Sequence, residues 1–397
     1  MTNAEHDPVV IAAAARTAIA SFQGAFATQG APQLGSAAIA AALARSGLAA
    51  GQVDEVVMGC VLPAGQGQAP ARQAALGAQL PQATGCTTVN KMCGSGMRAA
   101  MFAHDMLLAG SAQVIVAGGM ESMTNAPYLL PKARGGMRMG HGQVLDHMFL
   151  DGLEDAYDKG RLMGSFADEC AAEYGFTREA QDAYAIESLA RAKRANEDGS
   201  FGWEIAPLTI AGRKGETVVA RDEQPFSANP DKIPTLKPAF GPNGTVTAAN
   251  ASSISDGAAA LVMMRASTAE RLGAAPLARV VGHSTFAQAP ARFATAPVGA
   301  LQRLFERTGW RPSDIDLFEI NEAFAVVAMA AMKEHGLPHE RVNVNGGACA
   351  LGHPIGASGA RILVTLLGAL RARGGKRGVA SLCIGGGEAT AMAIELI

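Results

Sequence analysis

The segment NGGACALGHPIGASGARI, residues 345–362, is a glycine-rich turn that runs into an alanine- and leucine-rich segment, 357–375, and then into GVASLCIGGG, 378–387. Apolar residues at helical spacing, followed by basic residues and glycine, predict a helix over 357–375. The apolar run bounded by glycine predicts a buried strand after it. His353 lies in the turn. This part of the chain therefore reads as a turn with a reactive side chain, a helix and a strand.

The first half of the chain repeats this plan. NKMCGSGMRAA, residues 90–100, is another glycine-flanked turn before an apolar helix and a strand. Cys93 lies 39 residues after Asp54, and His353 lies 37 residues after Asp316; each aspartate opens an apolar, strand-like run. Strands that alternate with helices predict an α/β architecture, and the matched spacing favours an internal duplication. Alternation alone also occurs in other α/β enzymes.

We expect three parts along the chain. The first half covers residues 1–120 and is completed by about 248–272, and the second half covers 273–397. Between them, residues 121–247 hold loops rich in proline and glycine and a charged amphipathic helix at about 178–198. Such an inserted region covers a site or builds an oligomer contact.

Composition excludes several classes of function. The chain has 397 residues, long enough for more than one packed unit, and its 33 Lys and Arg against 35 Asp and Glu give a net charge of −2. This balance argues against nucleic acid as a partner. The N-terminal segment has no leader pattern, and no apolar run reaches the roughly 18 residues of a membrane span. We expect a cytoplasmic protein with no membrane partner.

The six cysteines are spread through the chain without a CxxC pair, so reduced thiols are expected. The eight histidines form no HExxH motif, and we expect no metal site. No GxGxxG follows the first strand with an acidic residue about 20 positions later, which disfavours a nicotinamide enzyme.

Cys93 is the first candidate for chemistry. The segment after it is expected to be helical from about Ser95, so the sulfur lies near a helix N-terminus. The positive end of the helix dipole and the free amides favour thiolate, which would lower the thiol pKa from its usual value of about 8.5. Such a thiol is a nucleophile. The alternative is a buried cysteine that acts as a small apolar residue.

His353, Cys383 and Asn321 are the other candidates. A neutral imidazole at His353 can take a thiol proton near pH 7, or it can be a histidine satisfied by core hydrogen bonds. Cys383 ends an apolar run before three glycines, where it could exchange a proton with a substrate carbon or be a core cysteine. Backbone amides in that turn could hold an oxyanion. Asn321, in NEAF, could hold a water molecule or cap a helix.

Taken together, NKMCGSGMRAA, GGMESMTNAPY, GTVTAANASSISDGAAA, NEAFA, NVNGGACALGHPIGASGARI and CIGGGEATAM resemble the thiolase family, specifically its acetyl-CoA acetyltransferases, nearly end to end. The resemblance implies a five-layered αβαβα core of two duplicated halves with an inserted loop domain. It also implies a homo-oligomer, with a tetramer favoured over a dimer. Coenzyme A esters would be substrates, with no permanently bound cofactor and no metal.

The resemblance also implies roles for the candidate residues. Cys93 would receive the acyl group, with His353 activating it, and Cys383 would remove a proton from the methyl carbon of a second acetyl-CoA. One oxyanion hole would consist of His353 and a water held by Asn321. The other would consist of the backbone amides of Cys93 and Gly385. Preorganised donors of this kind are commonly the largest catalytic contribution.

The implied contacts with coenzyme A are Ser252, Met163, Phe324, Ala248 and Leu236. Two departures from the family pattern concern the nucleotide end. Leu162 stands where many acetoacetyl-CoA thiolases have histidine, and an arginine often found near the adenine has no clear counterpart. We expect Lys232 or Arg221 to substitute for it.

The expected function is therefore the condensation of two acetyl-CoA molecules to acetoacetyl-CoA and CoA, and the reverse thiolysis, by a ping-pong route through S-acetyl-Cys93. An alternative is a 3-oxoacyl-CoA thiolase for longer chains in fatty-acid or aromatic degradation. A remote alternative is a non-catalytic acyl-CoA or lipid-binding protein on the same scaffold.

Overall fold

The computed structural model describes residues 7–212 and 215–397. Residues 1–6, where the N-terminal segment without a leader pattern begins, and residues 213–214, in the expected inserted region, lie outside this description. Among the described residues, no helix is both long and apolar enough to span a bilayer.

A large mixed sheet is the framework of the described chain. Its strands are β1 (Val9–Arg16), β2 (Ala20–Ser21), β3 (Glu55–Gly59), β4 (Gly85–Val89), β5 (Val114–Ser122), β10 (Ser255–Arg265), β11 (Ala278–Ala287), β12 (Leu317–Ile320), β13 (Arg377–Ile384) and β14 (Glu388–Leu396). Their order is β12-β13-β14-β11-β1-β10-β5-β3-β4, with β2 paired to β10. The antiparallel pair β1–β11 joins the two halves.

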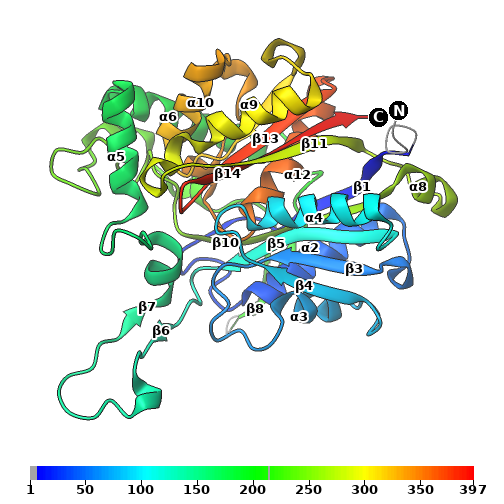
Figure 1. Cartoon of the computed structure of the whole chain (residues 1–397), viewed down its shortest axis with the longest axis horizontal. Coiled ribbons are helices and arrows are strands. Elements are labelled where there is room, and N and C mark those ends of the chain that lie inside the picture. Colours follow the sequence, from blue (N-terminus) through cyan, green and yellow to red (C-terminus); the bar gives the residue numbers. More distant parts are fainter. Residues whose placement is uncertain (1–6, 213–214) are drawn as a thin grey trace.

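Three layers of helices alternate with the two halves of the sheet, which gives five layers (Figure 1). The first outer layer is α2 (Ala31–Ser46) with α3 (Pro70–Gly77), and the second is α9 (Ala296–Thr308) with α10 (Ala325–His335). The middle layer is α4 (Ser95–Ala109) with α12 (Ser358–Arg373). Three separate apolar clusters fill the contacts between these helix layers and the sheet, one cluster for each layer. The expected five-layered α/β architecture is confirmed.

The two halves follow the same order of elements. In the first half, β3 precedes the Cys93 turn, α4 and β5, and β3 pairs in parallel with β5. In the second half, β12 precedes the His353 turn, α12 and β13, and β12 pairs in parallel with β13. In Figure 1 the blue and cyan half lies below and the yellow to red half above. Each middle-layer helix therefore begins just after a candidate catalytic residue.

Loops, short strands and helices occupy the region between β5 and β10. They are β6 (Tyr128–Leu129), β7 (Leu145–Asp146), α5 (Met163–Tyr174), α6 (Arg178–Glu197), β8 (Leu208–Gly212), β9 (Gly215–Val219) and α7 (Gln224–Ser227). Elsewhere are α8 (Ala266–Leu272) and α11 (Ala348–Leu351). The helix expected at 178–198 is α6, which begins where the Thr177 side chain accepts a hydrogen bond from the amide of Ala180. The three domain bounds stay a prediction.

Glycine allows the two halves to approach at their centre. A Cβ added to Gly96 of α4 would lie 2.8 Å from the backbone nitrogen of Ala360 in α12. A Cβ on Gly359 would overlap the backbone nitrogen of Met97 in the same way. The N-terminal turns of α4 and α12 therefore meet backbone to backbone. Residues just before both helices are brought to the same place.

The turn between His353 and α12 also packs directly against glycines of β3 and β5. A Cβ on Gly119 of β5 would overlap the carbonyl oxygen of Gly356, and one on Gly59 of β3 would lie 2.7 Å from that oxygen. Both contacts involve backbone atoms, which cannot rotate aside. The turn of the second half thus rests directly on the strands of the first.

We predict that Gly119→Ala destabilises the protein, because the methyl group overlaps a backbone carbonyl and overpacking of this kind costs about 1–3 kcal/mol or more. Gly51→Ala is the control, since a Cβ there meets nothing within 4 Å. Its free energy of unfolding should change by less than about 0.5 kcal/mol. Denaturant unfolding measures both, and equal stability of the two variants would contradict the prediction.

Candidate active site

Three segments that are distant in sequence meet at one cavity. The cavity has a volume of about 370 Å³ and is lined mostly by apolar side chains. Cys93, His353, Cys383 and Gly385 all line it. The structure therefore brings together the two thiols, the imidazole and the glycine-rich turn that the sequence singled out.

Local backbone geometry directs Cys93 toward this cavity. Met92 has a left-handed φ of 47°, which is uncommon for a residue other than glycine. The strained turn is held by Ser95, whose hydroxyl donates to the carbonyl of Met92 at 2.6 Å, and by Asn90, whose side chain accepts from the amide of Met92 at 2.9 Å. Cys93 leaves this turn two residues before α4 begins.

Glycine next to Cys93 lets the third segment come close. A Cβ on Gly94 would collide with the side chain of Ile384, the last residue of β13. Cys383 precedes Ile384 and is 1% exposed. Gly386 and Gly387 then turn the chain with φ of 93° and 87°. The CGSG turn and the CIGGG turn therefore pack against each other.

His353 is fixed in one tautomer by Ser358. The Ser358 hydroxyl donates to the carbonyl of Pro354 at 3.0 Å, and its oxygen lies 2.6 Å from Nδ1 of His353. Because that hydroxyl has one proton, Nδ1 of His353 must donate to it. Nε2, which has no hydrogen-bond partner among the described residues, is left with the lone pair. His353 is therefore set up to accept a proton at Nε2.

Burial determines the charge state of all three groups. It lowers the pKa of His353 to about 3, with the positive charge of Arg361 acting in the same direction. Burial also raises the pKa of Cys93 to about 11, although the backbone amides of Gly385 and Cys93 favour the thiolate. For Cys383, burial and then the neighbouring Cys93 raise the pKa well above its usual value. The resting site therefore holds neutral thiols and a neutral imidazole.

The expectation of a lowered pKa at Cys93 was wrong. The helix terminus and the amides do act in the expected direction. Their effect is smaller than the cost of placing a charge away from water, which disfavours the thiolate. The sequence shows the helix terminus but not the depth at which the packed halves bury it.

Asn321 lies behind the cavity and is not among the residues that line it. It is 1% exposed, and its backbone amide donates to the carbonyl of Ser381 in β13 at 2.9 Å. The guanidinium of Arg361 donates to Oδ1 of Asn321 at 3.4 Å and to Oε2 of Glu319 at 3.3 Å. The amide nitrogen of the Asn321 side chain has no partner in the described part of the chain. Arg361 thereby fixes which end of the amide is the free donor.

The expected contacts with coenzyme A fall into two groups. Ser252, Met163, Phe324 and Ala248 line the cavity, as does Leu162. Leu236, Lys232 and Ala248 line an adjacent cavity of about 290 Å³. Ala248 belongs to both, so the two cavities are neighbours.

Arg221 is elsewhere. It lines a third pocket, which shares Ser227 with the 290 Å³ cavity, and its guanidinium lies 4.3 Å from the ring centre of Phe226. Arg221 lines neither of the two neighbouring cavities. Of the two cations considered for the missing arginine, Lys232 lines one of the two cavities itself, whereas Arg221 lines the pocket that adjoins it.

Comparison with known families agrees with this geometry. Residues 9–267 match the family description "Thiolase, N-terminal domain", and residues 274–396 match "Thiolase, C-terminal domain". The chain belongs to the thiolase family. The resemblance carried by the motifs is thereby confirmed.

Similar proteins cover this thiolase almost completely. Acetyl-CoA acetyltransferase of Cupriavidus necator is 49% identical over 98% of this chain and 99% of its own length. Acetyl-CoA acetyltransferase 2 of Arabidopsis thaliana is 51% identical over 98% and 97%. A crystal structure of Acat5 thiolase from Ascaris suum in complex with coenzyme A has a TM-score of 0.93 and 41% identity, covering 98% of this chain and 100% of that one.

Sequence reasoning missed one buried residue beside the site. Glu121, at the end of β5, accepts hydrogen bonds from the amides of Val61 (2.9 Å), Leu62 (3.1 Å) and Gly356 (2.9 Å). Burial raises its pKa to about 7 even though these amides favour the carboxylate. Glu121 thus ties the His353 turn to the first half. An acidic residue in the fully buried run VIVAGGMES was the available signal.

We predict that alkylation of Cys93 by iodoacetamide accelerates as pH rises from 6 to 10, by roughly tenfold per unit, because the thiolate is the reactive form and its pKa of about 11 lies above this range. Peptide mapping after timed alkylation measures the rate at Cys93. A plateau below pH 8 would show that the thiol is already ionised and would refute the assignment.

We predict that Arg361→Met destabilises the protein by about 1–3 kcal/mol, because the buried Glu319, whose pKa burial raises to about 8, loses its hydrogen-bond partner. Adding Glu319→Gln should recover much of this loss, since a neutral amide needs no counter-ion. Denaturant unfolding of both single variants and the double variant gives the coupling energy. Strictly additive effects would contradict the ion pair.

Proposed function

We propose that this thiolase is an acetyl-CoA C-acetyltransferase, which condenses two acetyl-CoA molecules to acetoacetyl-CoA and CoA and also catalyses the reverse thiolysis. The observation that carries the proposal is the convergence of Cys93, His353 and Cys383 on one apolar cavity. The names of the relatives from Cupriavidus necator and Arabidopsis thaliana support it. Coenzyme A bound to the Ascaris suum thiolase supports CoA esters as the substrates.

The first half-reaction transfers the acetyl group to Cys93. Nε2 of His353 takes the thiol proton, and the sulfur attacks the thioester carbonyl carbon of acetyl-CoA. The bond between that carbon and the CoA sulfur then breaks, and the departing thiolate takes the proton from His353. His353 can act here because its lone pair is on Nε2 and its imidazole is neutral at physiological pH.

The second half-reaction needs Cys383 as a base. Acetylation removes the possible negative charge on Cys93, which is one cause of the raised pKa of Cys383. In the acetylated enzyme the Cys383 thiol first gives its proton to solvent, and it takes one back at the end of the cycle. The Cys383 thiolate then takes a proton from the methyl carbon of a second acetyl-CoA. That carbon attacks the acetyl carbonyl on Cys93, the carbon–sulfur bond breaks, and the Cys93 thiolate recovers the proton from Cys383.

Two sets of donors would hold the negative oxygen in these steps. The backbone amides of Cys93 and Gly385 already face the Cys93 sulfur. Nε2 of His353, once protonated, and a water molecule held by the side-chain amide of Asn321 would form the other set. The orphaned Asn321 nitrogen supports this water.

The carrier of the acyl group would extend from the first cavity into the second. Met163, Phe324 and Ser252 line the cavity that holds the thiols, and Lys232 and Leu236 line its neighbour. We therefore assign the pantetheine arm to the first group and the nucleotide end to the second, with Lys232 as the cation near phosphate. No permanently bound cofactor is needed by this scheme.

We also propose a cytoplasmic homotetramer. The hairpin of β6 and β7 projects from the body of the protein (Figure 1). It exposes large apolar side chains, including Tyr128 at 68% and Met139 at 98%. Exposed apolar residues gathered on one projection support a contact between subunits.

We predict that brief mixing with acetyl-CoA adds one acetyl group, and that peptide mapping places it on Cys93. Cys93→Ser should show no adduct. Cys383→Ala should still be acetylated but form no acetoacetyl-CoA, because the base for the second step is absent. Cys86→Ser, a cysteine outside the cavity, is the control and should behave as the parent. An adduct that maps to another residue would overturn the assigned roles.

The same preparation decides between the two enzymatic alternatives. Thiolysis of acetoacetyl-CoA should exceed thiolysis of longer 3-oxoacyl-CoA esters. A preference for the longer esters would favour the degradative alternative.

A further inference from the structure

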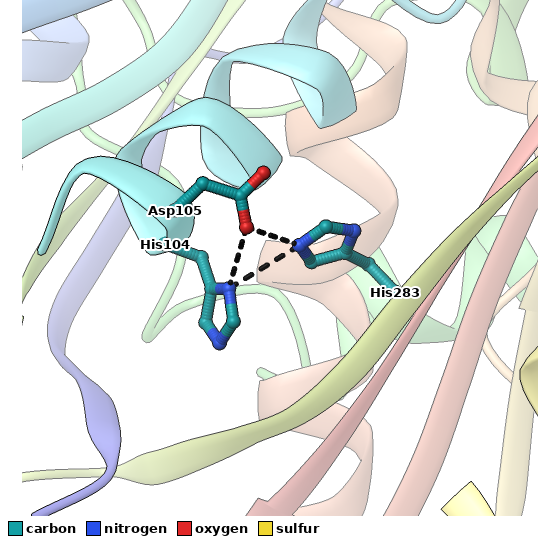
Figure 2. Close-up of side chains that lie close together, drawn as sticks. All are labelled: His104, Asp105 and His283. Atoms are coloured by element: carbon teal, nitrogen blue, oxygen red, sulfur yellow. Dashed lines mark hydrogen bonds and ion pairs between the residues drawn. The ribbon is translucent and has the colours of Figure 1, made fainter. Parts of the chain in front are cut away.

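A second group of titratable side chains lies away from the cavity, between the middle layer and the sheet. His104 and Asp105 come from the C-terminal half of α4, and His283 comes from β11 (Figure 2). Nε2 of His283 lies 3.2 Å from Nδ1 of His104 and 3.0 Å from Oδ1 of Asp105. Nδ1 of His104 lies 3.2 Å from the same carboxylate oxygen. These three atoms form a nearly equilateral triangle.

Hydrogen bonds alone do not satisfy this triangle. If both ring nitrogens carry protons toward the carboxylate, two N–H groups lie side by side with their nitrogens 3.2 Å apart. If one nitrogen lacks its proton, its lone pair faces the carboxylate oxygen. In either arrangement one edge of the triangle is unfavourable. A cation above its centre would use a lone pair from each of the three atoms.

The edge lengths fit a divalent transition metal. Zinc lies about 2.0–2.1 Å from imidazole nitrogen and about 2.0–2.2 Å from carboxylate oxygen, so ligands at tetrahedral angles are about 3.4 Å apart and ligands at right angles about 2.9 Å. The observed edges of 3.0 to 3.2 Å lie between these values. Two imidazoles and one carboxylate suit zinc and its neighbours in the periodic table better than magnesium or calcium.

We propose that His104, Asp105 and His283 bind one Zn²⁺ ion, with water completing its coordination. Access is available because the side chain of Asp105 is 52% exposed, whereas those of His104 and His283 are 11% and 7% exposed. The site therefore has a buried imidazole pair on one side and an open carboxylate side toward solvent.

The surroundings of the cluster shift the pKa values of its three side chains. Burial lowers the pKa of both histidines, and the nearby positive charge of Arg307 acts in the same direction. Arg265 adds to this at His104. Although burial opposes it, the neighbouring histidines lower the pKa of Asp105, so the carboxylate supplies the negative charge.

The ion would join the two halves of the core. His104 and Asp105 belong to α4, the helix that follows Cys93, whereas β11 begins the second half and pairs with β14. His104 lies nine residues after the start of α4, which corresponds to about 14 Å along the helix axis. The ion would thus stabilise the helix that carries the nucleophile without touching the reacting groups.

The sequence predicts no metal site because the ligands form no motif. His104 and His283 are 179 residues apart. The fold brings their side chains together where the C-terminal half of α4 passes β11.

The test uses the full chain after treatment with a chelator, with Co²⁺ as a spectroscopic probe. We expect visible d–d bands that saturate at one ion per chain, without the charge-transfer band of a cobalt–thiolate bond. His283→Gln and Asp105→Asn should each weaken binding by more than about 100-fold, because even partners behind the ligands contribute about 10- to 100-fold. His141→Gln is the control, since His141 is an exposed histidine outside the cluster.

Thermal unfolding provides a second measurement. Zn²⁺ should raise the Tm of the parent and of His141→Gln but not that of His283→Gln or Asp105→Asn, because an ion that binds only the folded state stabilises it. The half-exposed Asp105 allows a test even where a buried histidine variant does not fold. Chelation should leave the rate of acetoacetyl-CoA thiolysis unchanged at temperatures well below Tm.

Three results would overturn the proposal. The parent could give no Co²⁺ spectrum, the two cluster variants could bind as tightly as the parent, or the spectrum could show a thiolate band that disappears in Cys93→Ser. The last result would place the ion on the cavity cysteines.

Discussion

Close contact of backbone at the centre of the molecule is the constraint on which the site depends. Gly96 and Gly359 let α4 and α12 meet at their first turns, and Gly119 lets the Gly356 turn rest on β5. A side chain at any of these positions would hold the halves apart. Cys93 and His353 would then face different surroundings, because each is placed by the turn that precedes its helix.

Buried charge is the second determinant of the site. Glu121 gathers three backbone amides from two loops, and the Glu319–Arg361 pair lies behind Asn321. Buried charges are costly unless they are paired or hydrogen-bonded, so each fixes its partners in one arrangement. The groups that face the cavity are neutral at rest. Burial raises the pKa of Glu121 to about 7 and that of Glu319 to about 8, so the carboxyl groups that support the site titrate near neutral pH.

The sequence predicted what local patterns encode. Glycine-rich turns, apolar runs and helix endings indicated the order strand, turn, helix and strand in both halves, and the structure has β3, α4 and β5 in one and β12, α12 and β13 in the other. Quantities that depend on packing were not predictable. Examples are the burial that raises the pKa of Cys93, and the hydrogen bonds that Glu121 accepts from amides about 60 and 235 residues away.

The neutral state of the Cys93 thiol has a consequence for life in an oxidising cell. Peroxide attacks thiolates, and the product, a sulfenic acid, can be oxidised further to forms that are not reversible. Desolvation raises the pKa of the half-buried Cys93 thiol to about 11, so little of it is thiolate at neutral pH. A sulfur atom held in this neutral form is a slower target for peroxide than an ionised one, because the thiolate is the reactive species.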